Sequence, residues 1–233
     1  MSAEPQTPYE LDETAHARRL CDWMFDQYAS DVRGRVAEIG AGIGTFSERI
    51  LASGAESLLL VEPDPTCAAA LERRFGADPR VELSRDELPD APALRDGGFD
   101  LVVCQNVLEH IRDDAAAVEA MAAALAPEGR LVVLVPANPG LYGSLDRTYG
   151  HFRRYDRERL GAIVRGAGLE VVDLYSFNLL GVVGWWFKNL RPGSRVSARS
   201  LAAYELLVGA WRPVEERLRP RRGLSLIARA RRS

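Results

Sequence analysis

Three alternating glycines follow a carboxylate in the stretch Glu38-Ile-Gly40-Ala-Gly42-Ile-Gly44. Glycine lets the backbone turn sharply and lets a ligand approach it closely. A phosphate-binding loop of the G-x-x-x-x-G-K-S/T kind is excluded, because Lys188 is the only lysine in the chain. A dinucleotide fingerprint needs glycine or alanine at the position of Thr45 and is therefore disfavoured. The pattern that remains is D/E-x-G-x-G-x-G, which the stretch matches in full.

Further polar residues follow later apolar runs. Glu62 comes directly after "SLLLV", and a carboxylate at such a place can accept hydrogen bonds from both hydroxyls of a ribose. Dinucleotides share that requirement, so Glu62 alone does not identify the ligand. Asp86 lies in "RDELP", where it is a candidate ligand group or simply a helix N-cap. Gln105 and Asn106 follow the run "FDLVVC".

The segment from Val135 to Leu160 is long enough for a functional loop, and its polar and aromatic residues suit a substrate site. His151 is the best candidate for a catalytic base, because histidine titrates near neutral pH; its alternative role is to brace the loop. Arg153 and Arg154 are candidates to clamp an anionic group, or to form salt bridges with Asp146 or Asp156. Tyr155 is the second catalytic candidate, and the remaining substrate candidates are Tyr142 and Tyr149, although tyrosine rings buried in a lid are the alternative.

Alternating strand and helix patterns must position these residues. Apolar runs predict strands at 35–40, 57–62, 80–84, 99–105, 129–136, 169–177 and 224–230. Helical patterns lie between them at 43–52, 65–75, 113–125 and 156–167, after a first helix at 13–29. We therefore predict an α/β fold: a Rossmann-like, seven-stranded, mostly parallel sheet with helices on both faces and a helical insertion before the last strand. Ligands of such sheets bind beyond the carboxyl ends of the strands.

The chain divides into four parts on this pattern. Residues 1–30 form an N-terminal arm and helix, 31–178 the ligand-binding core, 179–222 a helical insertion or lid, and 223–233 the final strand with a basic tail. Within the insertion, Trp185, Trp186 and Phe187 beside Lys188 and Arg191 fit weak contact with a membrane surface. A roof over the site or a homodimer contact is the alternative.

Composition narrows the class of protein. The net charge of −3 over 233 residues gives no reason to expect a nucleic-acid partner. The three cysteines are far apart, which argues against a disulfide framework and a zinc site. The polar, acidic start is unlike a signal peptide, and we expect a cytoplasmic protein.

From about Arg35 to Phe177 the sequence resembles the class I S-adenosylmethionine (SAM)-dependent methyltransferases. The acidic glycine turn, Glu62, the "RDELP" stretch and "FDLVVCQNVLEHI" match the motifs of that family in order. The stretch "LDRTYGHFRRY" narrows the resemblance to a bacterial subgroup of the methyltransferase type 11/12 kind, often encoded beside natural-product genes.

The resemblance implies the cofactor SAM, with S-adenosylhomocysteine as product. It places Glu38 near the methionine amino group and Glu62 at the ribose. The adenine would lie near Pro63, and its exocyclic amine would meet Asp86. The other implied cofactor-binding residues are Gly40, Ala41, Gly42, Gly44, Glu87, Gln105 and Asn106.

Some relatives use an E-x-x-E-H segment to hold a metal, but here Asn106 replaces the first carboxylate. Asparagine is a weak, uncharged ligand, so we expect no metal and interpret Glu109 and His110 as a helix start and site wall. The predicted function is methyl transfer from SAM to oxygen or nitrogen of a small molecule, such as a natural product, a sugar or a lipid-linked substrate. The alternatives are a non-catalytic binding subunit and an NAD-dependent oxidoreductase.

Overall fold

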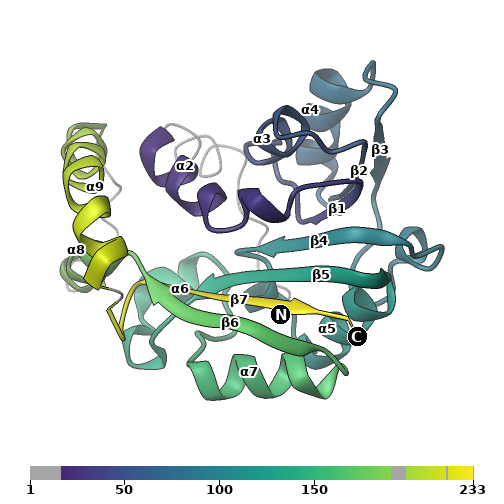
Figure 1. Cartoon of the computed structure of the whole chain (residues 1–233). Coiled ribbons are helices and arrows are strands. Elements are labelled where there is room, and N and C mark those ends of the chain that lie inside the picture. The colour runs from purple at the N-terminus through teal and green to yellow at the C-terminus, as the bar shows by residue number, and fades with distance from the viewer. Residues whose placement is uncertain (1–16, 190–197, 219, 233) are drawn as a thin grey trace.

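The computed structural model describes residues 17–189, 198–218 and 220–232 (Figure 1). The predicted arm at 1–12 and Arg191 lie outside these ranges. Seven strands form one sheet in the order β3-β2-β1-β4-β5-β7-β6. Their bounds are β1 Arg35–Ile39, β2 Ser57–Val61, β3 Val81–Ser84, β4 Phe99–Gln105, β5 Leu125–Pro136, β6 Glu170–Phe177 and β7 Ser225–Arg231.

Only β7 runs against its neighbours; it pairs antiparallel with both β5 and β6. The pairs of β1 with β2 and β4, of β2 with β3 and of β4 with β5 are parallel. This topology confirms the predicted seven-stranded, mostly parallel sheet.

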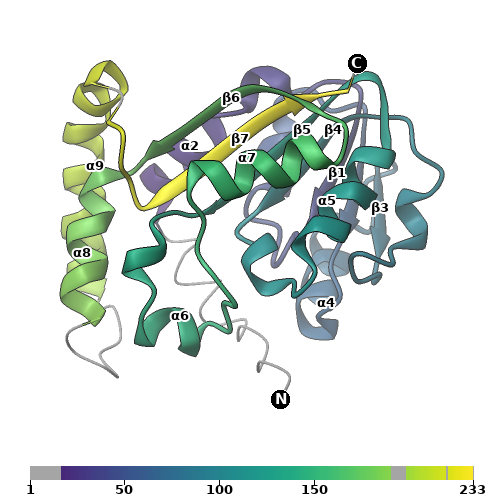
Figure 2. The ribbon, with the colours of Figure 1, turned by 90° about the horizontal axis from the view of Figure 1, so that it is seen from below.

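Alternation along the strands builds two cores, one on each face. In β2, Leu58 and Leu60 enter one apolar cluster, whereas Leu59 and Val61 enter the other. The first cluster packs against α2 (Arg18–Asp26), α3 (Ser47–Ala52) and α4 (Pro65–Phe75), and the second against α5 (Asp114–Ala123) and α7 (Arg157–Gly166). Figure 2 shows α5 and α7 together on one side of the sheet.

Three helices lie beyond the carboxyl ends of β4, β5 and β6: α6 (Ser144–Thr148), α8 (Leu179–Asn189) and α9 (Ala198–Leu218) (Figures 1 and 2). The buried Glu215 of α9 accepts the backbone amide of Leu179, the first residue of α8, and thereby ties the two helices together. None of the described helices is both long and apolar enough to cross a membrane. Trp186 and Leu206 are exposed, and contact with a membrane surface or a second copy remains a prediction.

Several predicted boundaries differ from the structure; the first helix, for example, ends at Asp26 and not at residue 29. The strand predicted at 129–136 begins earlier: β5 starts at Leu125 and runs through Pro127-Glu128-Gly129, with Glu128 in a left-handed conformation at φ 62°. Leu125 pairs with Phe99 before the register shifts, so sheet pairing outweighs the local turn chemistry. The helix expected from residue 43 begins only at Ser47, because the glycine turn continues to that point.

A buried carboxylate joins the start of the sheet to its end. Asp31 precedes β1 and is 1% exposed. It accepts hydrogen bonds from Nε and an NH2 group of Arg229 on β7, both at 2.9 Å, and it forms an ion pair with Arg130 on β5. Removing this carboxylate leaves two guanidinium groups without their shared partner.

We expect Asp31→Ala to lower the free energy of unfolding by about 3 kcal/mol, because breaking a buried pair costs far more than breaking an exposed one. The matched control is Asp90→Ala, which breaks the exposed pair with Arg95 and should cost less than about 1 kcal/mol. Urea unfolding measures both. Equal losses in the two variants would show that Asp31 is not a structural link.

Candidate functional site

The glycine turn after β1 needs its glycines for backbone geometry and for packing. Gly40 has φ 70° and Gly44 has φ 84°, both in the left-handed region that favours glycine. A Cβ on Gly40 would lie 2.2 Å from Val107, and one on Gly44 would lie 2.4 Å from Phe75. At Gly40 and Gly44 the turn therefore packs closely against Val107 and Phe75, which leaves no room for a Cβ atom.

Glu38, near the end of β1, is buried, and its Oε2 accepts a hydrogen bond from the Ser47 hydroxyl at 2.5 Å. Burial raises its pKa to about 8; the Ser47 hydrogen bond lowers the pKa, and the neighbouring charge of Glu62 raises it further. A carboxyl group in this state gains a cationic partner favourably, because that partner compensates for the lost water.

Glu62, directly after β2, bridges two turns. One carboxylate oxygen accepts the amide of Gly42 at 2.7 Å, and the other accepts the amide of Asp64 at 3.0 Å. Burial raises the pKa of Glu62 although both amides lower it. Asp64 in turn caps α4 by accepting the amides of Thr66 and Cys67.

The other expected cofactor residues also follow strands. Asp86, after β3, accepts the amide of Ala93 at 2.8 Å, so its carboxylate has a structural partner in this structure. Gln105 ends β4, and neither atom of its buried amide has a partner among the described residues. Asn106 adopts φ 53° directly after it. Ala41 is buried, whereas Pro63 and Glu87 are exposed.

Beyond β4, the short helix η3 (Leu108–His110) meets the loop that leads to α7. The His151 Nδ1 lies 3.0 Å from Oδ1 of Asp146, and its Nε2 lies 4.0 Å from Oε1 of Glu109. The rings of His110 and His151 meet edge to face at 4.8 Å. The Phe152 amide donates to the Glu109 carbonyl at 2.8 Å and fixes the loop against η3.

Burial shifts the pKa values of two titratable groups in this cluster, Glu109 and His110. Burial raises the pKa of Glu109 to about 7, although nearby His151 and Arg154 lower it. Burial also lowers the pKa of His110 to about 4, and the neighbouring His151 adds to that shift. Perturbed carboxyl and imidazole groups in contact are typical of sites that move protons.

Glu109, His110 and His151 each offer one ligand atom, and these atoms all lie within 4.8 Å of one another. The Glu109 Oε2 is buried without a hydrogen-bond partner among the described residues. The sequence suggested no metal because Asn106 replaces a carboxylate. It could not show that the distant His151 would supply a further donor at this point.

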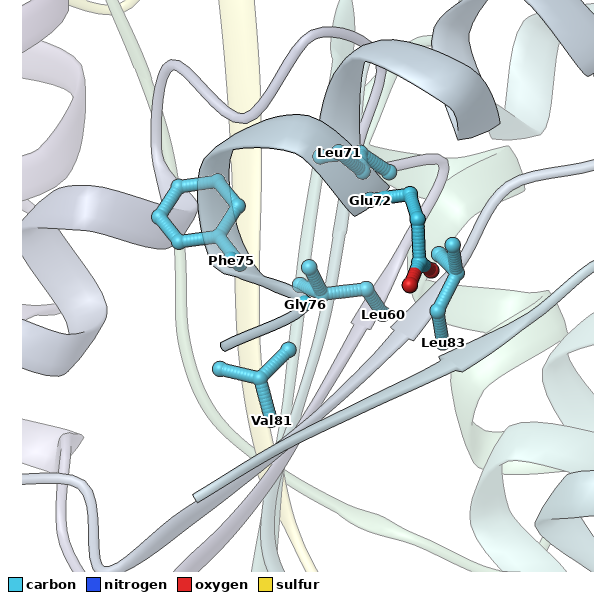
Figure 3. Close-up of a pocket in the computed structure, with 7 residues that line it drawn as sticks. All are labelled: Leu60, Leu71, Glu72, Phe75, Gly76, Val81 and Leu83. Carbon is cyan, nitrogen blue, oxygen red and sulfur yellow. The ribbon is translucent and has the colours of Figure 1, made fainter. Parts of the chain in front are cut away.

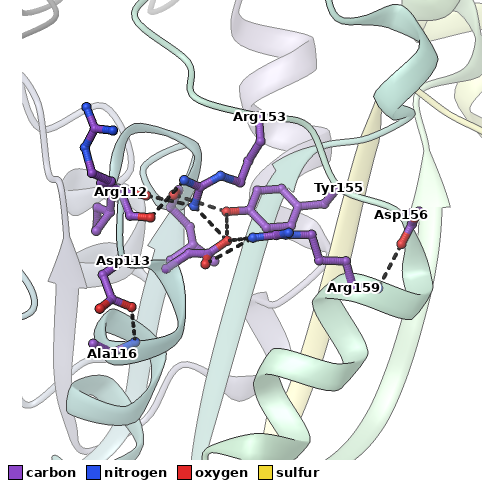
Figure 4. A network of polar contacts seen from close by, with 10 residues as sticks. Arg112, Asp113, Ala116, Arg153, Tyr155, Asp156 and Arg159 are labelled. Atoms are coloured by element: carbon purple, nitrogen blue, oxygen red, sulfur yellow. Dashed lines mark hydrogen bonds and ion pairs between the residues drawn. The ribbon is translucent and has the colours of Figure 1, made fainter. Parts of the chain in front are cut away.

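Tyr155, the second catalytic candidate of the sequence, lies inside the protein, and Figure 4 shows its contacts. Tyr155 is fully buried, and its hydroxyl donates to the Asp114 carboxylate at 2.9 Å, with the Leu108 carbonyl 3.2 Å away. Burial raises its pKa far above the usual range. Arg153, a candidate substrate clamp, also pairs with Asp114, at 2.8 Å, and donates to the carbonyl of Ile111.

Arg154 is also internal. It is 3% exposed, and its Nε donates to Asp146 at 2.7 Å, as the salt-bridge alternative proposed. Its guanidinium lies 4.4 Å from the ring centroid of Trp185 on α8. Both arginines therefore brace the loop, and the burial that decides this has no signal in the sequence.

Aromatic rings continue from His151 toward α8. Tyr149 lies 6.0 Å from His151 and 6.2 Å from Trp185 between ring centroids. Tyr142 is 37% exposed, and its hydroxyl donates to the His151 carbonyl at 2.8 Å. Trp185 has a buried Nε1 without a partner among the described residues; sequence analysis had placed it only in the insertion.

A separate hollow lies between α4 and the strands β2 and β3 (Figure 3). Its lining residues are Leu60, Leu71, Glu72, Phe75, Gly76, Val81 and Leu83. None of the motif residues lines it, so we do not regard it as the functional site.

Comparison with known proteins shows the family to which the chain belongs. Residues 12–174 match the family described as "Methyltransferase domain". A ubiquinone biosynthesis O-methyltransferase of Pseudomonas aeruginosa is 31% identical over 173 residues, which cover 66% of this chain and 71% of that protein. A methyltransferase-like protein of Schizosaccharomyces pombe is 28% identical over 53% of this chain, which spans 46% of that protein.

Among solved structures, an N-methyltransferase from Bradyrhizobium japonicum in complex with S-adenosylhomocysteine has the same fold. The TM-score is 0.60 at 18% identity, over 99% of this chain and 94% of that one. The family match and the O-methyltransferase relative decide against an NAD-dependent oxidoreductase. The chain therefore belongs to the class I SAM-dependent methyltransferases.

Proposed function

We propose that this methyltransferase acts on a hydroxyl or amino group of a small molecule that binds beside Glu109, His151 and Tyr149. One observation carries the proposal: a buried carboxylate and a histidine face each other beyond β4, next to the residues expected to hold the cofactor. The names of the relatives agree with either acceptor atom, since one is an O-methyltransferase and one an N-methyltransferase.

The cofactor site would use the strand ends of β1 to β4. When bound, SAM supplies a methyl group on a positively charged sulfur, and the acceptor's lone pair takes it as the carbon–sulfur bond breaks and S-adenosylhomocysteine leaves. Glu38 would meet the methionine ammonium and Glu62 the ribose hydroxyls. The unpartnered amide of Gln105 is available to a polar group at the same edge. Asp86, with its neighbour Glu87, would serve the adenine.

His151 would take the proton that the acceptor loses. Its Nδ1 side is occupied by Asp146, and its Nε2 lies 4.0 Å from Oε1 of Glu109. A positioned base of this kind typically contributes 10²–10⁴-fold to a rate. Glu109 would stabilise the imidazolium that forms, because a carboxylate favours a neighbouring cation.

A specific observation favours a second use of the same residues: the three converging donors Glu109, His110 and His151. Imidazole and carboxylate groups suit several divalent transition metals, and Asp146 on the other ring nitrogen of His151 is the kind of partner that orients such a ligand. In that case a metal would lower the pKa of a bound acceptor hydroxyl, and His151 would not act as a free base.

We expect binding of S-adenosylhomocysteine to release protons at about pH 7. Glu38, with a pKa of about 8, is then mostly protonated, and a bound ammonium favours its ionised form. Affinity should therefore rise several-fold as the pH rises toward about 8. Calorimetry in phosphate and in Tris measures the protons released, because the two buffers differ in ionisation enthalpy.

Glu38→Gln should weaken binding and abolish the buffer dependence. The matched control is Glu48→Gln on α3, whose side chain is 71% exposed and which should bind like the wild type. Identical binding enthalpies in both buffers for the wild-type protein would contradict the role given to Glu38.

For the reaction itself, we expect His151→Gln to lower methyl transfer by about 10²-fold or more, with the affinity for S-adenosylhomocysteine unchanged. Release of S-adenosylhomocysteine is measured across a panel of phenols, sugars and amines. Turnover by the wild-type protein should persist in EDTA. Loss of turnover in EDTA, restored by a divalent metal, would favour the metal over the free base.

A further inference from the structure

We propose that Asp146 is a positioning residue for His151: it holds the ring with the proton on Nδ1, so that Nε2 presents its lone pair to the acceptor. The inference rests on the proposed role of His151 as the base. The side chain of Asp146 is fully buried on α6.

Two bonds join the residues. The Asp146 Oδ1 lies 3.0 Å from the His151 Nδ1, and the Asp146 carbonyl accepts the backbone amide of His151 at 2.8 Å. Asp146 therefore holds both the ring and the backbone of His151. A ring held at one nitrogen and at its own backbone has little freedom to rotate.

The surroundings keep Asp146 ionised. Its Oδ1 accepts Nε of Arg154 at 2.7 Å, and its Oδ2 accepts the amide of Gly143 at 2.9 Å. A guanidinium in direct contact favours the charged form of a carboxylate, and the amide of Gly143 adds a second donor.

An ionised carboxylate can only accept hydrogen bonds. The nitrogen at 3.0 Å must therefore carry a hydrogen, and the neutral ring then has its lone pair on Nε2. This is the nitrogen that faces Glu109. When Nε2 takes the acceptor's proton, the ring becomes an imidazolium with Asp146 on one side and Glu109 on the other.

Trp185 extends the support to α8. Its ring stacks on the guanidinium of Arg154, which in turn donates a hydrogen bond to the Asp146 carboxylate. The order of contacts from α8 inward is therefore Trp185, Arg154, Asp146 and His151. In this series of contacts α8 therefore helps to hold His151 indirectly, through Arg154 and Asp146.

The tautomer of His151 can be measured without an acceptor. The chain has only three histidines, so long-range ¹H–¹⁵N correlation spectra of the labelled full-length protein contain three imidazole spin systems, and His151→Gln assigns one of them. We expect a protonated Nδ1 and an unprotonated Nε2 for neutral His151. A protonated Nε2 in the wild-type protein would overturn the proposal without any Asp146 variant.

Asp146→Asn should move His151 toward a mixture of tautomers, because an amide can donate as well as accept. The matched control is Asp114→Asn. Asp114 is also a buried carboxylate, but its ion-pair partners are Arg153 and Arg159 and do not include His151. This control variant should leave the tautomer unchanged. A shift of equal size in both variants would attribute the effect to general loosening of the loop.

The kinetic test is a double-mutant cycle on methyl transfer. Asp146→Asn should lower turnover roughly 10- to 100-fold in the wild-type background and have no further effect when His151 is glutamine. If it lowers turnover equally in both backgrounds, Asp146 does not act through His151. If His151→Gln alone leaves turnover unchanged, the proposed base fails instead, so the two failures are distinguishable.

Discussion

The parallel pairing of β1 with β2 and β4 is the constraint on which the rest of the site depends. Parallel strands end at the same edge of a sheet, so residues far apart in the sequence meet there. Glu38, Glu62 and Gln105 reach this edge from three neighbouring strands. Because β7 is antiparallel to β6, no crossover helix is needed on a face of the sheet between these two strands. The helices α8 and α9, which connect them, lie beyond the strand ends instead.

Buried charge at this edge is the second theme. Glu62 is satisfied by two backbone amides, and Asp114 and Asp146 are satisfied by arginines from a single loop. Glu38 and Glu109 have weaker compensation, and their pKa values of about 8 and about 7 reflect it. The groups left under-compensated are the two for which we propose a cation: the cofactor's ammonium and the imidazolium of His151.

The sequence predicted the scaffold well where a local pattern decides the structure. The structure has β4 at 99–105 and α4 at 65–75, as the apolar run and the helical pattern predicted. The start of β5 lies before the predicted residue 129, because pairing of Leu125 with Phe99 across the sheet outweighs the turn propensity of Pro127-Glu128-Gly129. The glycine turn was identified, but its closest neighbours are Val107 and Phe75, which no local pattern could reveal.

The site was predicted less completely, since partners distant in sequence decide which polar side chains remain available. The sequence offers Tyr155 as a catalytic candidate and Arg153 and Arg154 as substrate candidates, yet Asp114 and Asp146 bind these side chains internally. His151 keeps its candidacy because one of its ring nitrogens faces Glu109. The contact of Trp185 with Arg154 was not predicted, because it depends on how α8 packs against the loop.

We propose that the methyl group is presented between the strand ends and the Glu109–His151 pair. A crystal structure with S-adenosylhomocysteine and an acceptor tests this arrangement. We expect the ligand's ammonium at Glu38, its ribose at Glu62 and its sulfur turned toward Nε2 of His151. A sulfur that faces away from His151, or a ligand bound in the hollow beside α4, would contradict it.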